Sequence, residues 1–246
     1  MAERIALAGR VRELELVTHH LMGQSNLAAL LVVGEAGVGK SRLVTAAANR
    51  VADEDVLVLP GWCLAMSEGL PLLPVSEMLH ALERAEGGTL LALALRACAK
   101  FVRGELVRLL PALGEDESEE ARTETSARGF DEGWRRLRLF DALRQLLGAV
   151  ASRRSIAAVI EDVHWADPSS LEFLDFLLSP ARAADAIPVV LTCRSEETTF
   201  PGGGALVRAS RTQSEARTSR PRPVEPGGDR GADQPASHLR WRVGGC

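Results

Sequence analysis

Lysine is almost absent from this chain of 246 residues, which carries only Lys40 and Lys100 among its 29 Lys and Arg residues. Tyrosine is absent altogether and aromatic residues make up 4% of the chain, so we expect a core built mainly from Leu, Val and Ala. The 4 cysteines are widely separated and form no C-x-x-C pair. That spacing favours reduced thiols in a cytosol over a disulfide or zinc framework.

Signals for membranes and nucleic acids are also missing. The most apolar stretch, residues 90–99, is short and contains Arg96, so we expect no membrane-spanning segment. The N-terminus lacks the pattern of a signal peptide. The net charge of −4 gives no general reason to expect nucleic-acid binding. We therefore expect a cytoplasmic protein, and an apolar content of 46% is ample for its core.

One of the two lysines lies in a complete G-x-x-x-x-G-K-S motif, the signature of a phosphate-binding loop. The chain otherwise relies on Arg, so a Lys at this position indicates a site that needs a slim point charge. The alternative is a glycine-rich turn with a chance Lys. The predicted nucleotide-binding segment comprises Gly34, Glu35, Ala36, Gly37, Val38, Gly39, Lys40, Ser41 and the following Arg42.

The residues around the motif support a nucleotide site. The continuously apolar run at residues 27–33 predicts a strand buried on both faces of a parallel sheet. The loop glycines bring backbone N–H groups close to a phosphate, and a helix over about residues 39–51 directs its N-terminal dipole at the same anion. We expect Lys40 to reach the β- and γ-phosphates of ATP and the Ser41 hydroxyl to ligate Mg²⁺.

A second motif places two acids at the end of an apolar run. Residues 156–160 predict a buried parallel strand that leads directly into Glu161 and Asp162. Their carboxylates would lie at the carboxyl edge of the sheet, where ligands bind. One carboxylate holds Mg²⁺, directly or through water, and the other orients or deprotonates the attacking water. The alternative is a strand end that meets solvent.

The residues after the acid pair predict a loop and a helix. Asp167 is a good N-cap, and Pro168 suits the first position of a helix over residues 168–178. His164 either senses the γ-phosphate or the substrate water, or is a packed and hydrogen-bonded loop residue beside Trp165. No second His or Cys lies at metal-ligand spacing, so zinc is not expected.

A further strand is predicted at residues 187–193, followed by Arg194. Thr192 and Arg194 stand at its carboxyl end, where a polar or cationic residue could contact the γ-phosphate. Alternatively, Arg194 is a surface residue paired with Glu196 or Glu197.

The remaining elements follow from hydrophobic periodicity. A helix over residues 131–152 would place Leu137, Phe140, Leu143 and Leu147 on one face. Other predictions are a short helix at 11–17, a strand at 56–59 that ends at Pro60-Gly61, helices within 70–112, and an acidic solvated loop at 115–120.

Together these motifs resemble those of the signal-transduction ATPases with numerous domains (STAND), within the AAA-like P-loop class. The chain is similar to the N-terminal ATPase module of large LuxR-type transcriptional regulators, and to modules that accompany some adenylate and guanylate cyclase domains. The matching motifs are G-R-V-R-E-L from Gly9, the phosphate loop, R-L-F-D-A-L from Arg138, E-D-V-H-W-A-D from Glu161 and L-T-C-R-S from Leu191. The resemblance covers about residues 3–198.

The resemblance implies a three-layer αβα P-loop fold and a role for each matched residue. Glu161 would serve Mg²⁺, Asp162 would activate water as well as lie near the metal, and Arg194 would sense the γ-phosphate. Gly9 and Arg10 would lie near the adenine. The family's sheet has five parallel strands in the order 5-1-4-3-2.

The chain departs from that pattern after Phe200. We find four candidate strands and no fifth, so the strand that carries the phosphate loop would lie at an unprotected edge. The helical lid, the helix-turn-helix and the repeats of a full-length regulator are also not found, so we expect no DNA-binding domain in this chain. The predicted domain is residues 1–200, incomplete at its C-terminal side, followed by a tail at residues 201–246.

The tail has a composition of its own. It holds 8 of the 22 Gly and 5 of the 12 Pro, and its eight Arg against four acids give about +4, compared with about −8 for residues 1–200. No apolar periodicity is present, which favours a disordered linker. The alternatives are a basic nucleic-acid-binding tail and a truncated or frame-shifted gene product.

We therefore expect an α/β P-loop ATPase module that binds MgATP and hydrolyses it slowly, as a conformational switch in signalling or transcription regulation. The expected partners are ATP or ADP, together with self-association or protein partners. One alternative is a nucleotide-dependent interaction module without catalysis. Others are a non-functional fragment that lacks its fifth strand and a phosphoryl-transferring kinase, which would need a second substrate pocket.

Overall fold

The apolar runs predicted as buried strands form the middle of a parallel sheet. β1 (Ala29–Gly34), β4 (Val189–Arg194) and β3 (Ile156–Glu161) lie side by side, and β2 (Leu57–Trp62) pairs in parallel with β3. The order across the sheet is β2-β3-β4-β1-β5. The predicted α/β fold with a four-stranded parallel sheet is therefore confirmed, and the carboxyl ends of these strands share one edge.

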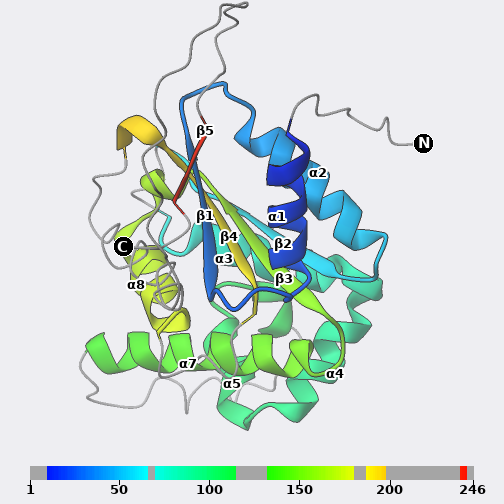
Figure 1. Cartoon of the computed structure of the whole chain (residues 1–246). Coiled ribbons are helices and arrows are strands. Elements are labelled where there is room, and N and C mark those ends of the chain that lie inside the picture. Colours follow the sequence, from blue (N-terminus) through cyan, green and yellow to red (C-terminus); the bar gives the residue numbers. More distant parts are fainter. Residues whose placement is uncertain (1–9, 66–69, 115–131, 180–186, 198–238, 243–246) are drawn as a thin grey trace, which may run out of the picture.

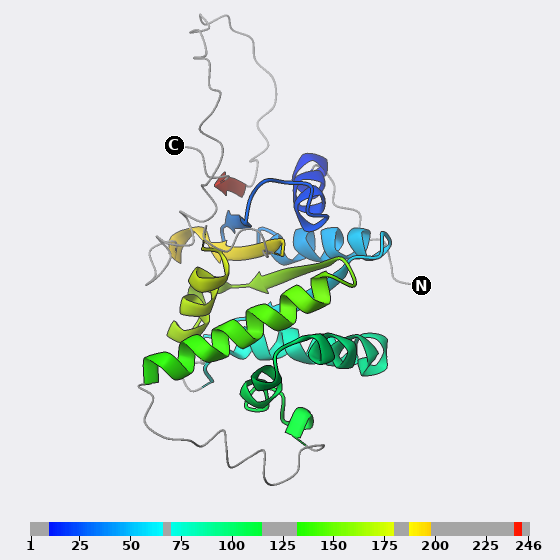
Figure 2. The ribbon, with the colours of Figure 1, turned by 90° about the horizontal axis from the view of Figure 1, so that it is seen from below.

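This computed structural model describes residues 10–65, 70–114, 132–179, 187–197 and 239–242, the last of these by backbone alone. Helices cover both faces of the sheet and give three layers, with α1 and α2 on one side and α3 and α7 on the other (Figures 1 and 2). The helices are α1 (Val11–Leu21), α2 (Lys40–Ala52), α3 (Leu73–Arg84), α4 (Thr89–Ala97), α5 (Lys100–Leu106), α7 (Glu132–Ala151) and α8 (Pro168–Leu177). Short 3₁₀ turns lie at Ala85–Gly88, Pro111–Gly114, Val163–Trp165 and Ser195–Glu197.

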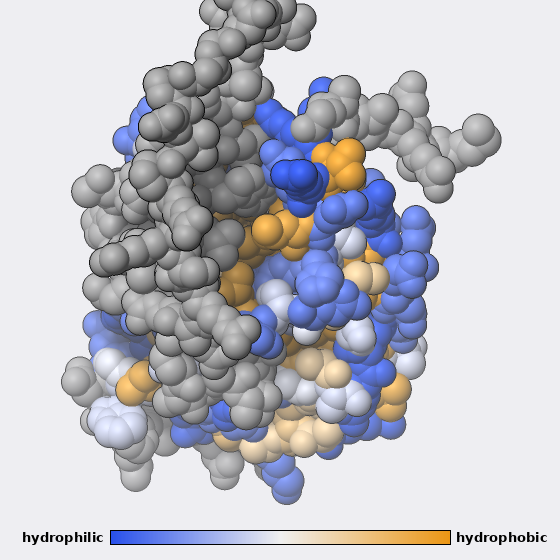
Figure 3. Space-filling view, viewed as in Figure 1, coloured by the Kyte–Doolittle hydropathy of each residue, from blue (hydrophilic) through white to orange (hydrophobic). Residues whose placement is uncertain are grey.

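Each central strand is buried on both faces because its side chains alternate between two hydrophobic cores. In β1, Leu30 and Val32 belong to the core under α1 and α2, whereas Leu31 and Val33 belong to the larger core under α3, α7 and α8. Seen from the side of α1 and α2, the coloured part of the surface, which belongs to described residues, is mainly hydrophilic with smaller apolar areas between (Figure 3). Because apolar side chains of the strands alternate between the two cores, both faces of the sheet need helices to cover them.

A buried histidine ties α1 to the sheet. The Nε2–H of His20 donates to the Val189 carbonyl at 3.0 Å, and its Nδ1 lies 2.5 Å from the Ser25 hydroxyl. Burial lowers the pKa of His20, so the ring is neutral at neutral pH. α1 begins where the sequence predicted a short helix and continues to Leu21.

The edge of the sheet beside β1 differs from the expectation. β5 (Leu239–Arg242) pairs antiparallel with residues Leu31 to Gly34 of β1, so the expected unprotected edge is wrong for this part of β1. The described residues contain no fifth parallel strand. The acidic run at 115–120, and residues 201–238 and 243–246 of the predicted tail, lie outside the described residues. The domain boundary near residue 200 therefore stays a prediction.

Two further expectations need correction. Pro60 and Gly61 lie inside β2 instead of ending it, which a proline can do because β2 is an edge strand. In α7, Phe140, Leu143 and Leu147 are buried as predicted, but Leu137 is 47% exposed. Leu137 lies in the N-terminal part of α7, where most side chains are exposed.

Gly61 is required because α3 approaches β2 too closely for a side chain. A Cβ at Gly61 would lie 2.6 Å from the Pro74 carbonyl oxygen, a backbone atom that cannot move away freely. We expect Gly61→Ala to lower the free energy of unfolding by about 1–3 kcal/mol, measured by urea denaturation. In the control Gly148→Ala the added Cβ has no neighbour within 4 Å, and stability should stay equal or rise. Equal midpoints for Gly61→Ala and wild type would contradict this account.

Candidate functional site

The phosphate loop turns sharply between β1 and α2. Gly37 has a φ of 74° and Gly39 a φ of 90°, a left-handed conformation that glycine adopts without steric cost. Gly39 is the N-cap of α2, so the positive end of the helix dipole and its free N–H groups open toward the loop. Local sequence thus shapes an anion-binding cradle.

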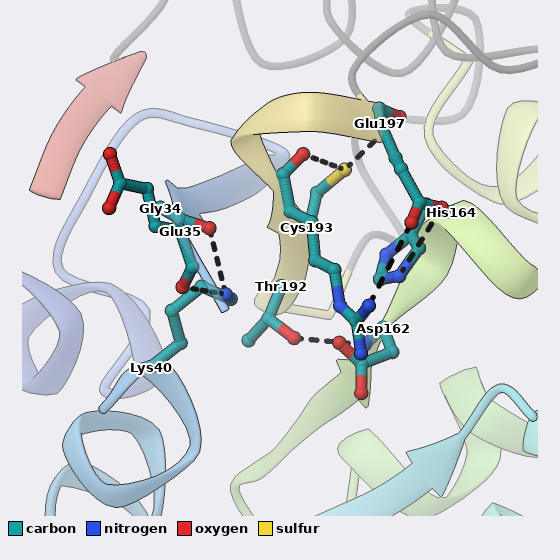
Figure 4. A network of polar contacts seen from close by, with 9 residues as sticks. Gly34, Glu35, Lys40, Asp162, His164, Thr192, Cys193 and Glu197 are labelled. Carbon is teal, nitrogen blue, oxygen red and sulfur yellow. Dashed lines mark hydrogen bonds and ion pairs between the residues drawn. The ribbon is translucent and has the colours of Figure 1, made fainter. Parts of the chain in front are cut away.

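Lys40 is the centre of this loop. Its side chain is buried, with the residue only 8% exposed. The ammonium Nζ donates to the carbonyls of Gly34 at 2.8 Å and Glu35 at 3.0 Å (Figure 4). Within the described residues no carboxylate lies at ion-pair distance from it. The loop therefore holds a positive charge that has polar neighbours but no counter-ion.

The acid pair lies at the same edge of the sheet. Glu161 is the last residue of β3 and stands beside Trp62 of β2 in the parallel register. Asp162 follows with a φ of 56°, a left-handed conformation that is uncommon outside glycine. Its backbone N–H donates to the Thr192 hydroxyl at 2.9 Å. Thr192 is buried and its hydroxyl accepts this bond, and a contact of Thr192 with the γ-phosphate stays a prediction.

Arg194 ends the neighbouring strand. In the β1–β4 register its Cα is paired with that of Gly34, the first residue of the phosphate loop. Its guanidinium carbon lies 4.4 Å from the centroid of the Trp165 ring, and its Nη1 lies 3.8 Å from Glu197 Oε1. The predicted pairing with Glu197 is thus present, and the stacking on Trp165 is a contact that the sequence did not reveal.

His164 packs behind this group. Its side chain is fully buried, and its ring lies 4.6 Å from the Trp165 ring. Burial lowers the pKa of His164, an effect that the Glu197 carboxylate opposes. Neither ring nitrogen has a hydrogen-bond partner in the described part of the chain. The expected packing is confirmed, whereas the expected hydrogen bond is not found there.

The N-terminal motif is described only in part. Arg10 lies against the phosphate loop, because its Nη1 is 3.4 Å from the point where a Cβ of Gly39 would be. Gly9 lies outside the described residues. Of the other loop residues, Glu35, Ala36, Ser41 and Arg42 are exposed, which leaves them accessible to a ligand at the start of α2. The structure therefore brings Arg10, Lys40, the acid pair and Arg194 to the carboxyl ends of the parallel strands.

A family comparison agrees with this arrangement. The family model of the AAA ATPase domain matches residues 6–191, which is most of the chain. The chain belongs to the AAA ATPase domain family. Comparisons with curated proteins and with solved structures find no match. The matched part of this AAA ATPase domain includes the phosphate loop and the acid pair and ends inside β4, just before Arg194.

The chemistry of the side chains in this AAA ATPase domain suits a hard divalent cation. Ser41, Glu161 and Asp162 offer oxygen atoms, the ligands that Mg²⁺ takes. Burial is the main cause that raises the pKa of the nearby Cys63 to about 12 and of Cys193 to about 11, so both thiols are protonated at neutral pH. Among the described residues no group of three or more His, Cys, Asp or Glu side chains could hold a metal alone. A Mg²⁺ ion here would depend on phosphate oxygens as well.

Asp167 has a structural role larger than the N-cap that the sequence predicted. It is buried, and its carboxylate accepts from the N–H groups of Ser169 at 3.0 Å and Ser170 at 3.1 Å, and from the Ser170 hydroxyl. It also accepts a hydrogen bond from the N–H of Leu72 at 3.2 Å, although Leu72 lies 95 residues earlier in the chain. Leu72 has a φ of 61° directly before α3. The loop after the acid pair is thereby joined to the start of α3.

No helix among the described residues is long and apolar enough to cross a membrane.

Because Asp167 satisfies several buried donors, we expect Asp167→Ala to lower the free energy of unfolding by about 2–4 kcal/mol, from the lost cap and the unpaired Leu72 N–H. Urea denaturation measures this change. The control Asp175→Ala removes an exposed carboxylate from the same helix and should change stability by no more than about 0.5 kcal/mol. Equal effects of the two substitutions would contradict the role of Asp167.

Proposed function

We propose that this AAA ATPase domain binds MgATP and hydrolyses it slowly, as a conformational switch in signalling or transcription regulation. The observation that carries the proposal is the buried Lys40 ammonium, which is bonded to two carbonyls and has no counter-ion within the described residues. A charge held in this way is stabilised further by an anion, and the glycine loop presents backbone N–H groups at the same place. A triphosphate meets both requirements.

The proposed roles follow from the positions of the side chains. Lys40 holds the β- and γ-phosphates, and Arg10 lies at the same loop, close to the nucleotide. Ser41 and Glu161 hold Mg²⁺, which when bound neutralises charge on the phosphate oxygens. Asp162 lies one residue beyond β3 and orients or deprotonates the attacking water. Arg194, beside Gly34 in the register, contacts the γ-phosphate.

A regulatory role, rather than metabolic turnover, is supported by the sequence motifs. The H-W-A-D stretch that ends at Asp167 and the opening motif that starts at Gly9 resemble those of the ATPase module of LuxR-type regulators. We infer that the nucleotide state of such a module controls its contacts with other domains, with protein partners or with a second copy. A cytoplasmic location is part of the same proposal.

Lys40→Ala tests the binding site. Hydrogen bonds to charged groups contribute about 1.5–3 kcal/mol, so loss of the ammonium should weaken ATP binding at least about tenfold. Isothermal titration calorimetry in the presence of Mg²⁺ measures the affinity. Lys100→Ala, at the exposed start of α5, replaces the chain's other lysine and should leave the affinity unchanged. Equal ATP affinity in wild type and Lys40→Ala would refute the assignment.

Asp162→Asn tests hydrolysis separately from binding. Amide and carboxylate have the same shape, but the amide cannot accept a proton from water, so phosphate release should fall by about 10²-fold or more, to the background of the assay. ATP affinity should stay within a few-fold of wild type. If wild type releases no more phosphate than Asp162→Asn, the domain is a nucleotide-binding module without catalysis.

A further inference from the structure

The Arg194 side chain contacts two residues, Trp165 and Glu197, which lie in the turns that follow β3 and β4. The guanidinium lies over the Trp165 ring at 4.4 Å, a distance typical of a cation–π contact. Its Nη1 is 3.8 Å from Glu197 Oε1, and both side chains are about one third to two fifths exposed. The pair is therefore loose and partly solvated, so its members can separate at small cost.

Glu197 is placed for this contact by the turn that follows β4. The 3₁₀ turn Ser195–Glu197 begins directly after Arg194, so the acid reaches back to the arginine three residues earlier. Its backbone carbonyl accepts a weak hydrogen bond from the Cys193 thiol at 3.8 Å. Its second carboxylate oxygen faces His164 Nε2 at 3.7 Å (Figure 4). The carboxylate thus lies between two side chains of the site.

The same arginine starts beside the phosphate loop. Its Cα is the register partner of Gly34, whose carbonyl accepts from Lys40 Nζ. Two anions would compete for the long, flexible side chain of Arg194. One is the carboxylate of Glu197, and the other would be the terminal phosphate of a nucleotide held by Lys40. A bidentate pair with a phosphate uses two guanidinium N–H groups in one planar geometry, so a move of Arg194 onto the phosphate would weaken its contact with Glu197.

We propose that Glu197 is a positioning residue that holds Arg194 on Trp165 and competes with the γ-phosphate for it. This inference rests on the proposed nucleotide binding. ATP must draw Arg194 away from Glu197, whereas ADP has no γ-phosphate and leaves the pair intact. Glu197 therefore lowers the affinity for ATP relative to ADP and sets how strongly the domain discriminates between its two nucleotide states.

Glu197→Gln tests the proposal, with ATP and ADP affinities measured by calorimetry in Mg²⁺, using a non-hydrolysable analogue for ATP. The amide keeps the shape but not the charge, so ATP binding should tighten about two- to fivefold, the range expected for a partly exposed ion pair. ADP binding should stay unchanged. A gain in affinity cannot come from a variant that folds poorly.

Two controls make the result specific. Glu196→Gln removes the same charge from the exposed neighbouring residue and should change neither affinity. In an Arg194→Gln background, adding Glu197→Gln should no longer favour ATP, because the residue through which Glu197 acts is gone.

Three results would overturn the inference. One is an equal gain for ATP and ADP, or the same gain in Glu196→Gln, which would mark a general effect of charge. Another is a gain that persists without Arg194. The third is an unchanged ATP to ADP ratio in Glu197→Gln. Absence of binding of either nucleotide to wild type would instead overturn the proposed function itself.

Discussion

The buried ammonium of Lys40 is the constraint on which the rest of the site depends. A cation removed from water is destabilising by several kcal/mol unless polar groups surround it. Here the carbonyls of Gly34 and Glu35 supply that environment. They reach the Lys40 ammonium because the loop turns back toward the start of α2. Gly37 and Gly39 adopt the left-handed backbone conformations that this turn of the loop requires. The shape of the loop and the charge it holds are thus a single feature.

The parallel sheet places charged residues of both signs around the phosphate loop. Because the four parallel strands end at one edge, Gly34, Glu161 and Arg194 come together from three distant parts of the chain. The connections behind the edge are hydrogen-bonded. Asp162 is joined to β4 through the Thr192 hydroxyl, and Asp167 joins the same loop to the start of α3. The acid pair therefore lies at the end of β3 and the start of a loop that is hydrogen-bonded on both sides. Among the described residues, the Arg194 side chain makes a cation–π contact with Trp165 and a partly solvated ion pair with Glu197.

The local patterns that could be predicted are those with a short-range physical cause. The apolar runs that became β1, β3 and β4, and the Pro168 start of α8, follow from burial on both faces and from capping chemistry. The prediction failed where neighbours decide. Pro60 and Gly61 have the composition of a turn, yet they continue β2 because it is an edge strand and because α3 packs against Gly61. β5, with the sequence Leu-Arg-Trp-Arg, alternates apolar and basic residues over only four positions, a pattern too short to indicate a strand by itself, and its pairing with β1 reveals it.

The sequence by itself determined the phosphate loop, the acid pair after a buried strand and the fold class, because each depends on residues close together in the chain. Only the tertiary structure decided which ring lies beside Arg194. Its stacking on Trp165 depends on how the loop after β3 packs beside the end of β4, whereas its pairing with Glu197, three residues later, is local and was open to prediction. The tertiary structure also decided that His164 is buried without a hydrogen bond from the described residues. Such contacts join segments about thirty residues apart and have no periodic signal, because packing in three dimensions selects them.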